Sequence, residues 1–184
     1  MASLFGHAVA SIALGNGFLK TKKKFKFWFL AVFCAILPDF DVISFKFGIA
    51  YNSFWGHRGF THSFVFAILI GFLITYLFYR KIDIPVNGNN KKFKYFLFFT
   101  LCTASHPILD ALTNGGLGVA FFAPFDNSRY FFPWRPIQVS PIGIANFFGE
   151  RGLKVIKSEL VYIGLPSLVL IFLIKIRHYF SIKK

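Results

Sequence analysis

Long apolar runs separated by short polar stretches dominate the pattern of this sequence. Five runs stand out, over residues 4–19, 27–37, 60–79, 93–112 and 160–176. A membrane-spanning helix needs about 20 apolar residues, so the last three runs are long enough by themselves. The first two must include flanking residues or lie tilted inside a bundle. The pattern therefore predicts an all-α, polytopic membrane helix bundle of about five transmembrane helices, forming one integral membrane domain over residues 1–184.

The composition agrees with this prediction and excludes other classes of protein. Hydrophobic residues make up 55% of the chain, charged residues only 15%, and the mean hydropathy is +0.58. An ordinary soluble domain is about a quarter charged, so that class is excluded. The aromatic content of 21% excludes a disordered chain. Only two cysteines are present, both inside apolar runs, which argues against a disulfide-stabilised scaffold.

The basic residues predict the orientation in the membrane. The formal net charge is +14, and 14 of the 21 basic residues follow the first run, follow the third run or lie in the tail. By the positive-inside rule, these three regions are cytoplasmic, with the N-terminus outside and the C-terminus inside a bacterial cytoplasmic (inner) membrane. The lysine-rich stretches lack interleaved aromatic residues, so no nucleic acid is expected as a partner, whereas membrane lipids are.

Histidine and aspartate residues gather at the opposite, outer face of this predicted topology. They come from four separate pieces of chain, namely His7, the pair Asp39 and Asp41, the motif with His57, Arg58 and His62, and the pair His106 and Asp110. The topology was predicted from basic residues alone, so this convergence is an independent observation. Ionisable groups at membrane depth are costly, and they indicate a functional site.

The spacing of these residues suits a metal site. His106 and Asp110 are four residues apart, so a helix places them on one face, and Asn114 extends that face if the helix continues. Asp39 and Asp41 point the same way if the chain there is extended. Imidazole with carboxylate suits zinc and related metals. The predicted ligands of a divalent metal ion are His7, Asp39, His57, His62, His106 and Asp110.

Two residues are expected to take part in catalysis. Arg58 is four residues from His62 and is expected to share a helix face with it, where its guanidinium would hold an anionic group of the substrate. Asp41 is the second, either as a group near the metal or as the carboxylate that orients a histidine. Which of Asp39 and Asp41 is a ligand stays open, and Glu159 is either an extra ligand or a residue at the start of a helix.

A metal ion that activates water favours hydrolysis of an ester or phosphoester, including that of a lipid. Two other classes stay open: a non-catalytic, metal-stabilised membrane protein, and an ion carrier that uses aspartate and histidine as a relay. No inverted repeat is visible, and the polar residues gather at one face, which argues against transport. A triad of Ser63, His106 and Asp110 lacks the nucleophile elbow that would support it.

The same motifs resemble a bacterial family of small inner-membrane proteins described as membrane-bound metal-dependent hydrolases, some of them LexA-regulated. The matching pieces are His7, the Pro38–Asp41 element, the His57–Ser63 motif and the stretch HPILDALTNGG that begins at His106. The loop with its Phe-Ala-Pro-Phe and Phe-Pro-Trp motifs, after residue 121, also looks like this family. The resemblance covers roughly residues 3–165 and implies a metal-dependent hydrolase.

A more distant likeness is to zinc-dependent phospholipase C and the related single-strand nucleases. Their ligands come in the order of an early His, an Asp, a His, then His-x-x-x-Asp and finally His-x-x-x-Glu. The sequence follows this order as far as Asp110. The last pair is missing, because Val155 stands four residues before Glu159. This likeness implies one or two zinc ions rather than a trinuclear cluster.

Overall fold

The computed structural model describes residues 1–18, 24–81, 91–141 and 147–182. The elements within these ranges are helical, and they are α1 (Leu4–Phe18), α2 (Phe25–Ile36), η1 (Leu37–Phe47), η2 (Phe60–His62), α3 (Phe64–Tyr79), α4 (Lys91–Ala111), α6 (Glu150–Glu159), η3 (Leu160–Gly164) and α7 (Leu165–Ile182). The described residues contain no strand, only two isolated β-bridges. The all-helical prediction is therefore confirmed. Some residues used in the charge argument lie outside the described ranges: Lys20, Lys22, Lys23, Lys183 and Lys184.

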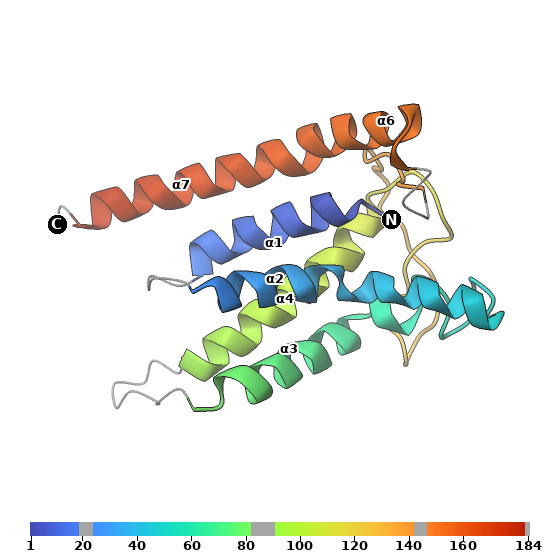
Figure 1. Ribbon diagram of the computed structural model, residues 1–184, viewed down its shortest axis with the longest axis horizontal. Helices are drawn as coiled ribbons and strands as arrows, with labels where there is room; N and C mark the ends of the chain where they lie inside the picture. Colours follow the sequence, from blue (N-terminus) through green and yellow to red (C-terminus); the bar gives the residue numbers. More distant parts are fainter. Residues whose placement is uncertain (19–23, 82–90, 142–146, 183–184) are drawn as a thin grey trace.

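Five helices run roughly side by side along the long axis of the molecule, in the order α7, α1, α2, α4 and α3 from top to bottom (Figure 1). The chain begins at one end of this bundle and finishes at the other. The end where α1 begins and α4 ends is called the polar end below, and the opposite end is called the basic end. At the basic end α2 begins beside Lys24 and Lys26, α3 ends beside Arg80, and α4 begins with Lys91.

The boundaries of two helices differ from the apolar runs for local reasons. Helix α3 begins at Phe64 rather than at residue 60, because the Ser63 hydroxyl caps it by accepting a hydrogen bond from the Phe66 amide at 3.0 Å. The fifth run continues a helix that already begins at Glu150. Two segments, Phe25–Phe47 and Glu150–Arg177, are long and apolar enough to cross a bilayer by themselves. Five crossings and the orientation of the termini stay predictions.

An apolar core fills the basic half of the bundle. Phe27 of α2 stacks on Phe98 of α4 with ring centroids 4.6 Å apart, and Ile74 of α3 belongs to the same buried cluster. Helices α3 and α4 approach closely at Gly71, where a Cβ atom would lie 2.1 Å from the Thr100 hydroxyl oxygen. Small residues that let backbones approach in this way are typical of helix packing in membranes.

The distribution of polarity is the reverse of that in a soluble domain. Large apolar side chains of α3 and α7 are exposed, including Phe72 and Phe172. At the polar end, in contrast, histidine, aspartate and arginine side chains are buried. Exposed apolar surface of this extent is typical of a protein whose helices face lipid.

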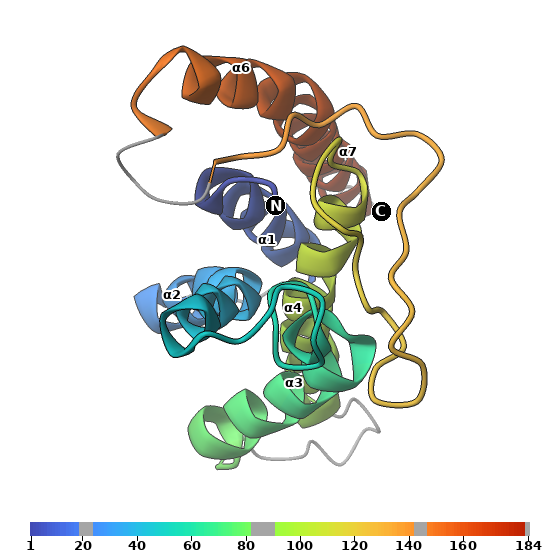
Figure 2. The ribbon, with the colours of Figure 1, turned by 90° about the vertical axis from the view of Figure 1, so that its right-hand side faces the viewer.

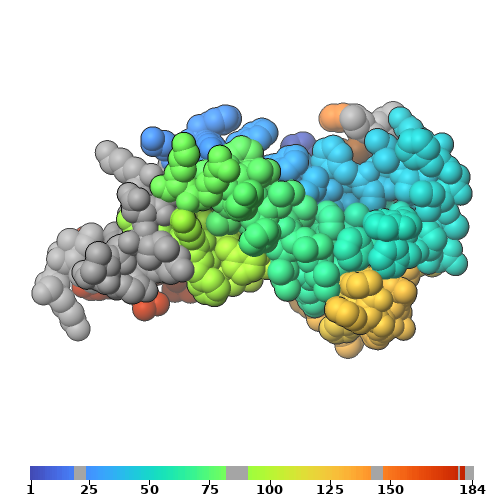
Figure 3. Space-filling view, turned by 90° about the horizontal axis from the view of Figure 1, so that it is seen from below, coloured from blue at the N-terminus to red at the C-terminus, as the bar shows by residue number. Residues whose placement is uncertain are grey.

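The segment from residue 112 to 141 leaves the end of α4 and wraps around the polar end before the chain reaches α6 (Figure 2). Its gold-coloured part lies against the teal segment that joins η1 to α3 (Figure 3). Backbone hydrogen bonds join the two, from Ala120 to the Arg58 carbonyl at 3.0 Å and from Phe64 to the Phe121 carbonyl at 3.0 Å. These contacts close the polar end of the bundle over the buried charges.

Candidate metal centre

Buried ionisable side chains from four pieces of chain meet at the polar end. This polar cluster consists of His7 of α1, Asp39 and Asp41 of η1, His57 and Arg58 before η2, His62 of η2, and His106 and Asp110 of α4. Each is at most 9% exposed. The structure thus brings together all of the residues that the sequence singled out as ligands and catalytic groups, and their roles stay predictions.

Four of these residues form the tightest group: Asp39, His62, His106 and Asp110. The Nε2 atom of His106 lies 3.1 Å from Nε2 of His62 and 3.2 Å from Oδ1 of Asp39. The His62 Nε2 atom also lies 3.7 Å from Oδ1 of Asp39 and 3.6 Å from Oδ2 of Asp110. Ligands at 2.0–2.1 Å around a tetrahedral zinc ion are about 3.4 Å from one another. These four pairs therefore have the spacing of neighbouring ligands in a coordination shell, and the ligand atoms of all four side chains lie within 4.8 Å of one another.

The partners of the Nδ1 atoms of His62 and His106 show which ring nitrogens carry the protons. Nδ1 of His106 donates to the Ala35 carbonyl at 2.7 Å, and Nδ1 of His62 lies 3.1 Å from the Asp41 carboxylate. Both partners only accept hydrogen bonds, so each Nδ1 carries a proton, and each Nε2 of a neutral ring presents a lone pair. Two lone pairs and two carboxylates then face one another, an arrangement that a cation stabilises. A backbone carbonyl and a carboxylate are also the usual partners of metal-binding histidines.

The charges of the cluster lead to the same conclusion. Asp39, Asp41 and Asp110 carry three negative charges, and Arg58 is the cluster's one arginine. With the neutral imidazoles that metal binding requires, the three carboxylates outnumber the arginine by two. Such a state is costly, and a divalent cation would cancel the excess. One oxygen of Asp39, Oδ2, also has no hydrogen-bond partner among the described residues. The residues present thus fit a divalent metal ion.

Asp41 contacts two histidines rather than the centre of the group. Its Oδ1 atom lies 2.6 Å from Nδ1 of His57, and its Oδ2 atom accepts a hydrogen bond from the Thr61 hydroxyl at 2.6 Å. The condition under which Asp39 and Asp41 would point the same way, an extended chain, is not met. The chain there is a 3-10 helix instead of an extended strand, so the two carboxylates reach different edges of the His62 ring. Asp41, His57 and His62 form a second group with metal-ligand spacing.

His57 lies outside the helices, in the segment that joins η1 to η2. Burial lowers its pKa below the usual value, and the neighbouring Asp41 carboxylate opposes this shift. The net direction is downward, so the imidazole is neutral at pH 7. Because Nδ1 is committed to Asp41, Nε2 is the nitrogen left for a ligand or a proton.

Arg58 is buried, and its donors are directed to groups of the protein. Its Nε atom lies 3.0 Å from Oδ2 of Asp110, and its terminal nitrogens donate to the Gly115 carbonyl at 2.9 Å and the Thr113 hydroxyl at 3.0 Å. The expectation that Arg58 shares a helix face with His62 was wrong. Arg58 has a left-handed backbone with φ of 62°, and α3 begins only after His62. The following glycine, Gly59, allows this tight turn.

His7 and Glu159 lie at the edge of the cluster. The His7 ring stacks on His106 with centroids 3.7 Å apart, and its Nε2 atom lies 3.5 Å from Oδ1 of Asp110. Neither ring nitrogen of His7 has a hydrogen-bond partner among the described residues, so the ring is available as a further ligand. Glu159 stands at the end of α6, not at a helix start, and binds the Ser3 amide and hydroxyl instead of the cluster.

Other residues that complete the site were missed in the sequence. Arg129, far along the chain, donates to the His57 carbonyl at 2.9 Å and to the Tyr51 carbonyl at 3.0 Å. Its residue type gives no signal of this, because the partners are backbone atoms. Asn114 would extend the face of His106 and Asp110 only if the helix continued that far; α4 ends at Ala111, and Asn114 donates to Gln138.

Fold and site together define an all-helical bundle with a buried histidine and aspartate cluster, suited to a divalent cation, at one end. Residues 1–181 match the YdjM inner membrane protein family, and the chain belongs to this family. The inner membrane protein YbcI of Escherichia coli (strain K12) is 36% identical over 170 residues, which cover 92% of this chain and 95% of the relative. No solved structure matches this chain. An inner-membrane location is therefore shown.

Proposed function

We propose that the protein is a metal-dependent hydrolase that cleaves an ester or phosphoester, in particular that of a lipid, at the outer face of the inner membrane. One observation carries the proposal. Two imidazole Nε2 atoms and two carboxylates lie within 4.8 Å of one another, four of their pairs at 3.1–3.7 Å, buried at one end of a membrane bundle. A cation placed among them would be held near the membrane surface, where a lipid's ester bonds lie.

Asp39, His62, His106 and Asp110 are the proposed ligands of one divalent ion, with zinc the best fit to this donor set. When bound with one coordination position left open to water, such an ion would activate that water at neutral pH and polarise the oxygen of an ester or phosphoryl group. The Ala35 carbonyl and Asp41 fix the orientation of the two imidazoles. His7 supports a further ligand position beside Asp110.

Arg58 and His57 are the other residues with proposed roles. The contacts of Arg58 favour a role in balancing the charge of Asp110, since its donors are already directed to protein groups. A direct contact between Arg58 and an anionic substrate would require these bonds to rearrange. His57, neutral and oriented by Asp41, is the group we propose to accept or return a proton at Nε2 during hydrolysis.

The experiment combines metal analysis with a hydrolysis screen. The wild-type protein, purified in detergent, is expected to contain about one divalent ion per chain and to hydrolyse at least one member of a panel of phosphoesters and lipid esters. The His106→Ala variant should lose both properties. Ser105→Ala is the matched control. Ser105 directly precedes His106, and the change removes only a hydroxyl that donates to the Cys102 carbonyl. This control should keep metal and activity.

The result separates the enzyme from a non-catalytic metal protein. Stoichiometric metal in the wild type with no hydrolysis across the panel would overturn the hydrolase and leave a metal-stabilised membrane protein. Absence of bound metal after loading with Zn²⁺ would overturn both.

A further inference from the structure

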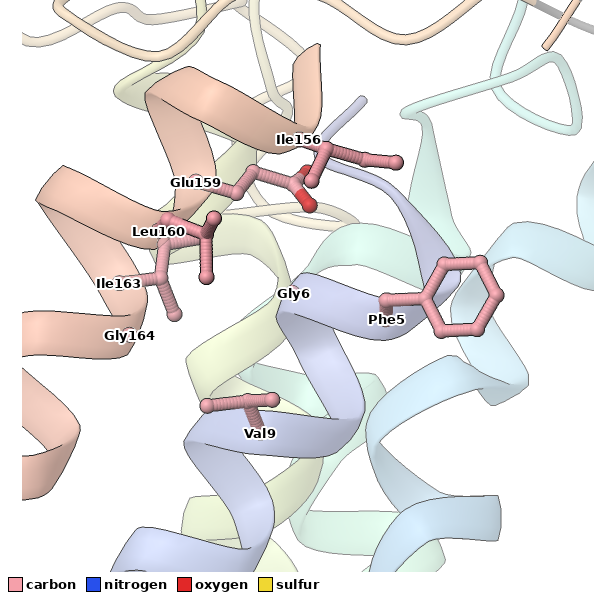
Figure 4. Close-up of a pocket in the computed structure, with 8 residues that line it drawn as sticks. All are labelled: Phe5, Gly6, Val9, Ile156, Glu159, Leu160, Ile163 and Gly164. Atoms are coloured by element: carbon pink, nitrogen blue, oxygen red, sulfur yellow. The ribbon is translucent and has the colours of Figure 1, made fainter. Parts of the chain in front are cut away.

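A groove of about 290 Å³ lies on the outside of the bundle between α1 and the helix formed by α6 and η3 (Figure 4). Its lining residues are Phe5, Gly6, Val9, Ile156, Glu159, Leu160, Ile163 and Gly164. Gly6, Glu159 and Ile163 are buried and form the floor. Phe5, Val9 and Leu160 are exposed and form the rims. We propose that this groove binds one hydrocarbon chain of a membrane lipid, and that the lipid so held belongs to the substrate class of the metal centre.

The chemistry of the floor selects a hydrocarbon chain over a polar group. Glu159 is the groove's one ionisable residue, and both of its carboxylate oxygens are already used. One accepts a hydrogen bond from the Ser3 amide, and the other accepts from the Ser3 hydroxyl at 2.5 Å. The Ser3 hydroxyl in turn accepts from the Gly6 amide at 3.3 Å, so Glu159 completes the N-terminal cap of α1. What remains to contact a ligand is apolar.

The surroundings of the groove identify lipid as its occupant. In the most apolar window of the helix Glu150–Arg177 only 17% of the residues are buried. Leu168 and Phe172 continue the exposed apolar surface from the groove along α7. In an inner-membrane protein this surface faces acyl chains, and the groove is a recess in it. A π-helical turn, Leu160–Gly164, forms its wall, and such turns are frequent at functional sites.

The first residues of the chain connect the groove to the proposed metal centre. Ser3 binds Glu159 in the floor, and the preceding residue, Ala2, donates its amide to Oδ1 of Asp110 at 2.7 Å. One residue step therefore separates the floor of the groove from a proposed ligand. A chain that lies along α1 from Val9 to Phe5 has its polar end at the level of the cluster. Binding of the chain does not depend on hydrolysis, but its assignment to the substrate rests on the proposed function.

Photo-crosslinking tests the binding site directly. The full chain is placed in vesicles that contain a phosphatidylethanolamine with a diazirine in one acyl chain, and adducts are mapped by mass spectrometry. Adducts are expected to be enriched on residues 5–9 and 156–164 compared with the exposed surface of α7. Gly164→Phe fills the groove, since a Cβ there meets only ordinary contacts at 3.7 Å. It should lower these adducts by at least about tenfold, because even one methylene in an apolar pocket changes binding by that factor.

Two control variants keep the test specific. Val161→Phe adds the same ring to an exposed position of η3 outside the groove and should leave the adducts unchanged. Gly164→Ala reports whether the backbone at this position tolerates a side chain. Adducts spread evenly over α7 would overturn the site.

Kinetics then separate the two proposals. Gly164→Phe should raise KM for a long-chain ester and leave the hydrolysis of a short, water-soluble ester unchanged. Enriched adducts without any hydrolysis would overturn the hydrolase and its lipid substrate while retaining the acyl-chain site. Equal loss of long-chain and short-chain hydrolysis in Gly164→Phe would overturn the assignment of the groove to the substrate.

Discussion

Helices α2 and α4 run from the basic end to the polar end, and each changes character along its length. Near the basic end, Phe27 stacks on Phe98 inside an apolar core. Near the polar end, the Ala35 carbonyl of α2 accepts a hydrogen bond from His106 of α4. Apolar packing tolerates the loss of one contact at a graded cost. Buried charges are different, because loss of one partner leaves the other without compensation. The polar end is therefore the more sensitive region, and it contains the proposed metal centre.

The largest effect is expected from Arg58→Ala, which removes the guanidinium that lies 3.0 Å from Asp110. Breaking a buried ion pair on one side costs about 3–5 kcal/mol of stability. Arg129→Ala is the matched control, because this half-buried arginine donates to backbone carbonyls, and its loss should cost about 1–3 kcal/mol. Thermal unfolding in detergent measures both. A stable Arg58→Ala protein that keeps its metal and loses only turnover would instead support contact with the substrate.

A smaller effect is expected from Phe98→Ala in the apolar core near the basic end. Phe98 is buried, and the cavity left by its ring should cost about 3 kcal/mol of stability. The metal content of the folded fraction should remain that of the wild type, since Phe98 belongs to the apolar core and not to the polar cluster. Metal analysis after removal of aggregated protein checks this. Loss of metal from a folded Phe98→Ala protein would show that the two ends are coupled.

A smaller effect is expected from Asp41→Asn. The change weakens the hydrogen bonds that Asp41 makes with His57 and His62, and it leaves the four proposed metal ligands in place. Residues that orient metal ligands typically contribute about 10–100-fold to metal affinity. Competition with a chromophoric zinc chelator measures the change. Asp126→Asn, in the segment around the polar end but outside the cluster, should bind zinc like the wild type. Equal affinities of all three proteins would contradict the role of Asp41.

The smallest effect concerns packing between α3 and α4. Gly71→Ala places a Cβ against Thr100 and should destabilise the protein by about 1 kcal/mol, since overpacking costs somewhat more than alanine gains in helix propensity. Gly149→Ala meets nothing within 4 Å and serves as the control. Unfolding midpoints in detergent compare the two. A Gly71→Ala protein as stable as Gly149→Ala would contradict the close approach of these helices.

The sequence predicts the helices and the convergence of the site well, because both depend on local spacing and on the order of charged loops. His106 and Asp110 share a face of α4, as their four-residue spacing requires. The same four-residue spacing gave a wrong prediction for Arg58 and His62. Arg58 has a left-handed backbone, and His62 lies in a short 3-10 helix, so no α-helix joins them. The helix does not continue to Asn114, because contacts with residues 137–139 replace it there.

The hydrogen-bond partners that lie far apart in the sequence could not be predicted, and the reason is physical. Arg129 and the Ala35 carbonyl complete the site through hydrogen bonds to backbone atoms and a histidine far away in sequence. Backbone groups carry no sequence signal, and which of them is free depends on how helices end and pack. The roles of Asp39 and Asp41 likewise became distinguishable only once η1 was seen to be a 3-10 helix.

X-ray absorption at the zinc edge of the zinc-loaded wild-type protein tests the proposed metal centre. We expect one tightly bound ion with two imidazole nitrogens, from His62 and His106, and carboxylate oxygens at about 2.0–2.1 Å. The imidazole signal should disappear in the double variant of these two histidines. A spectrum without imidazole scattering, or one that is unchanged in the double variant, would contradict a metal centre at the polar end of the bundle.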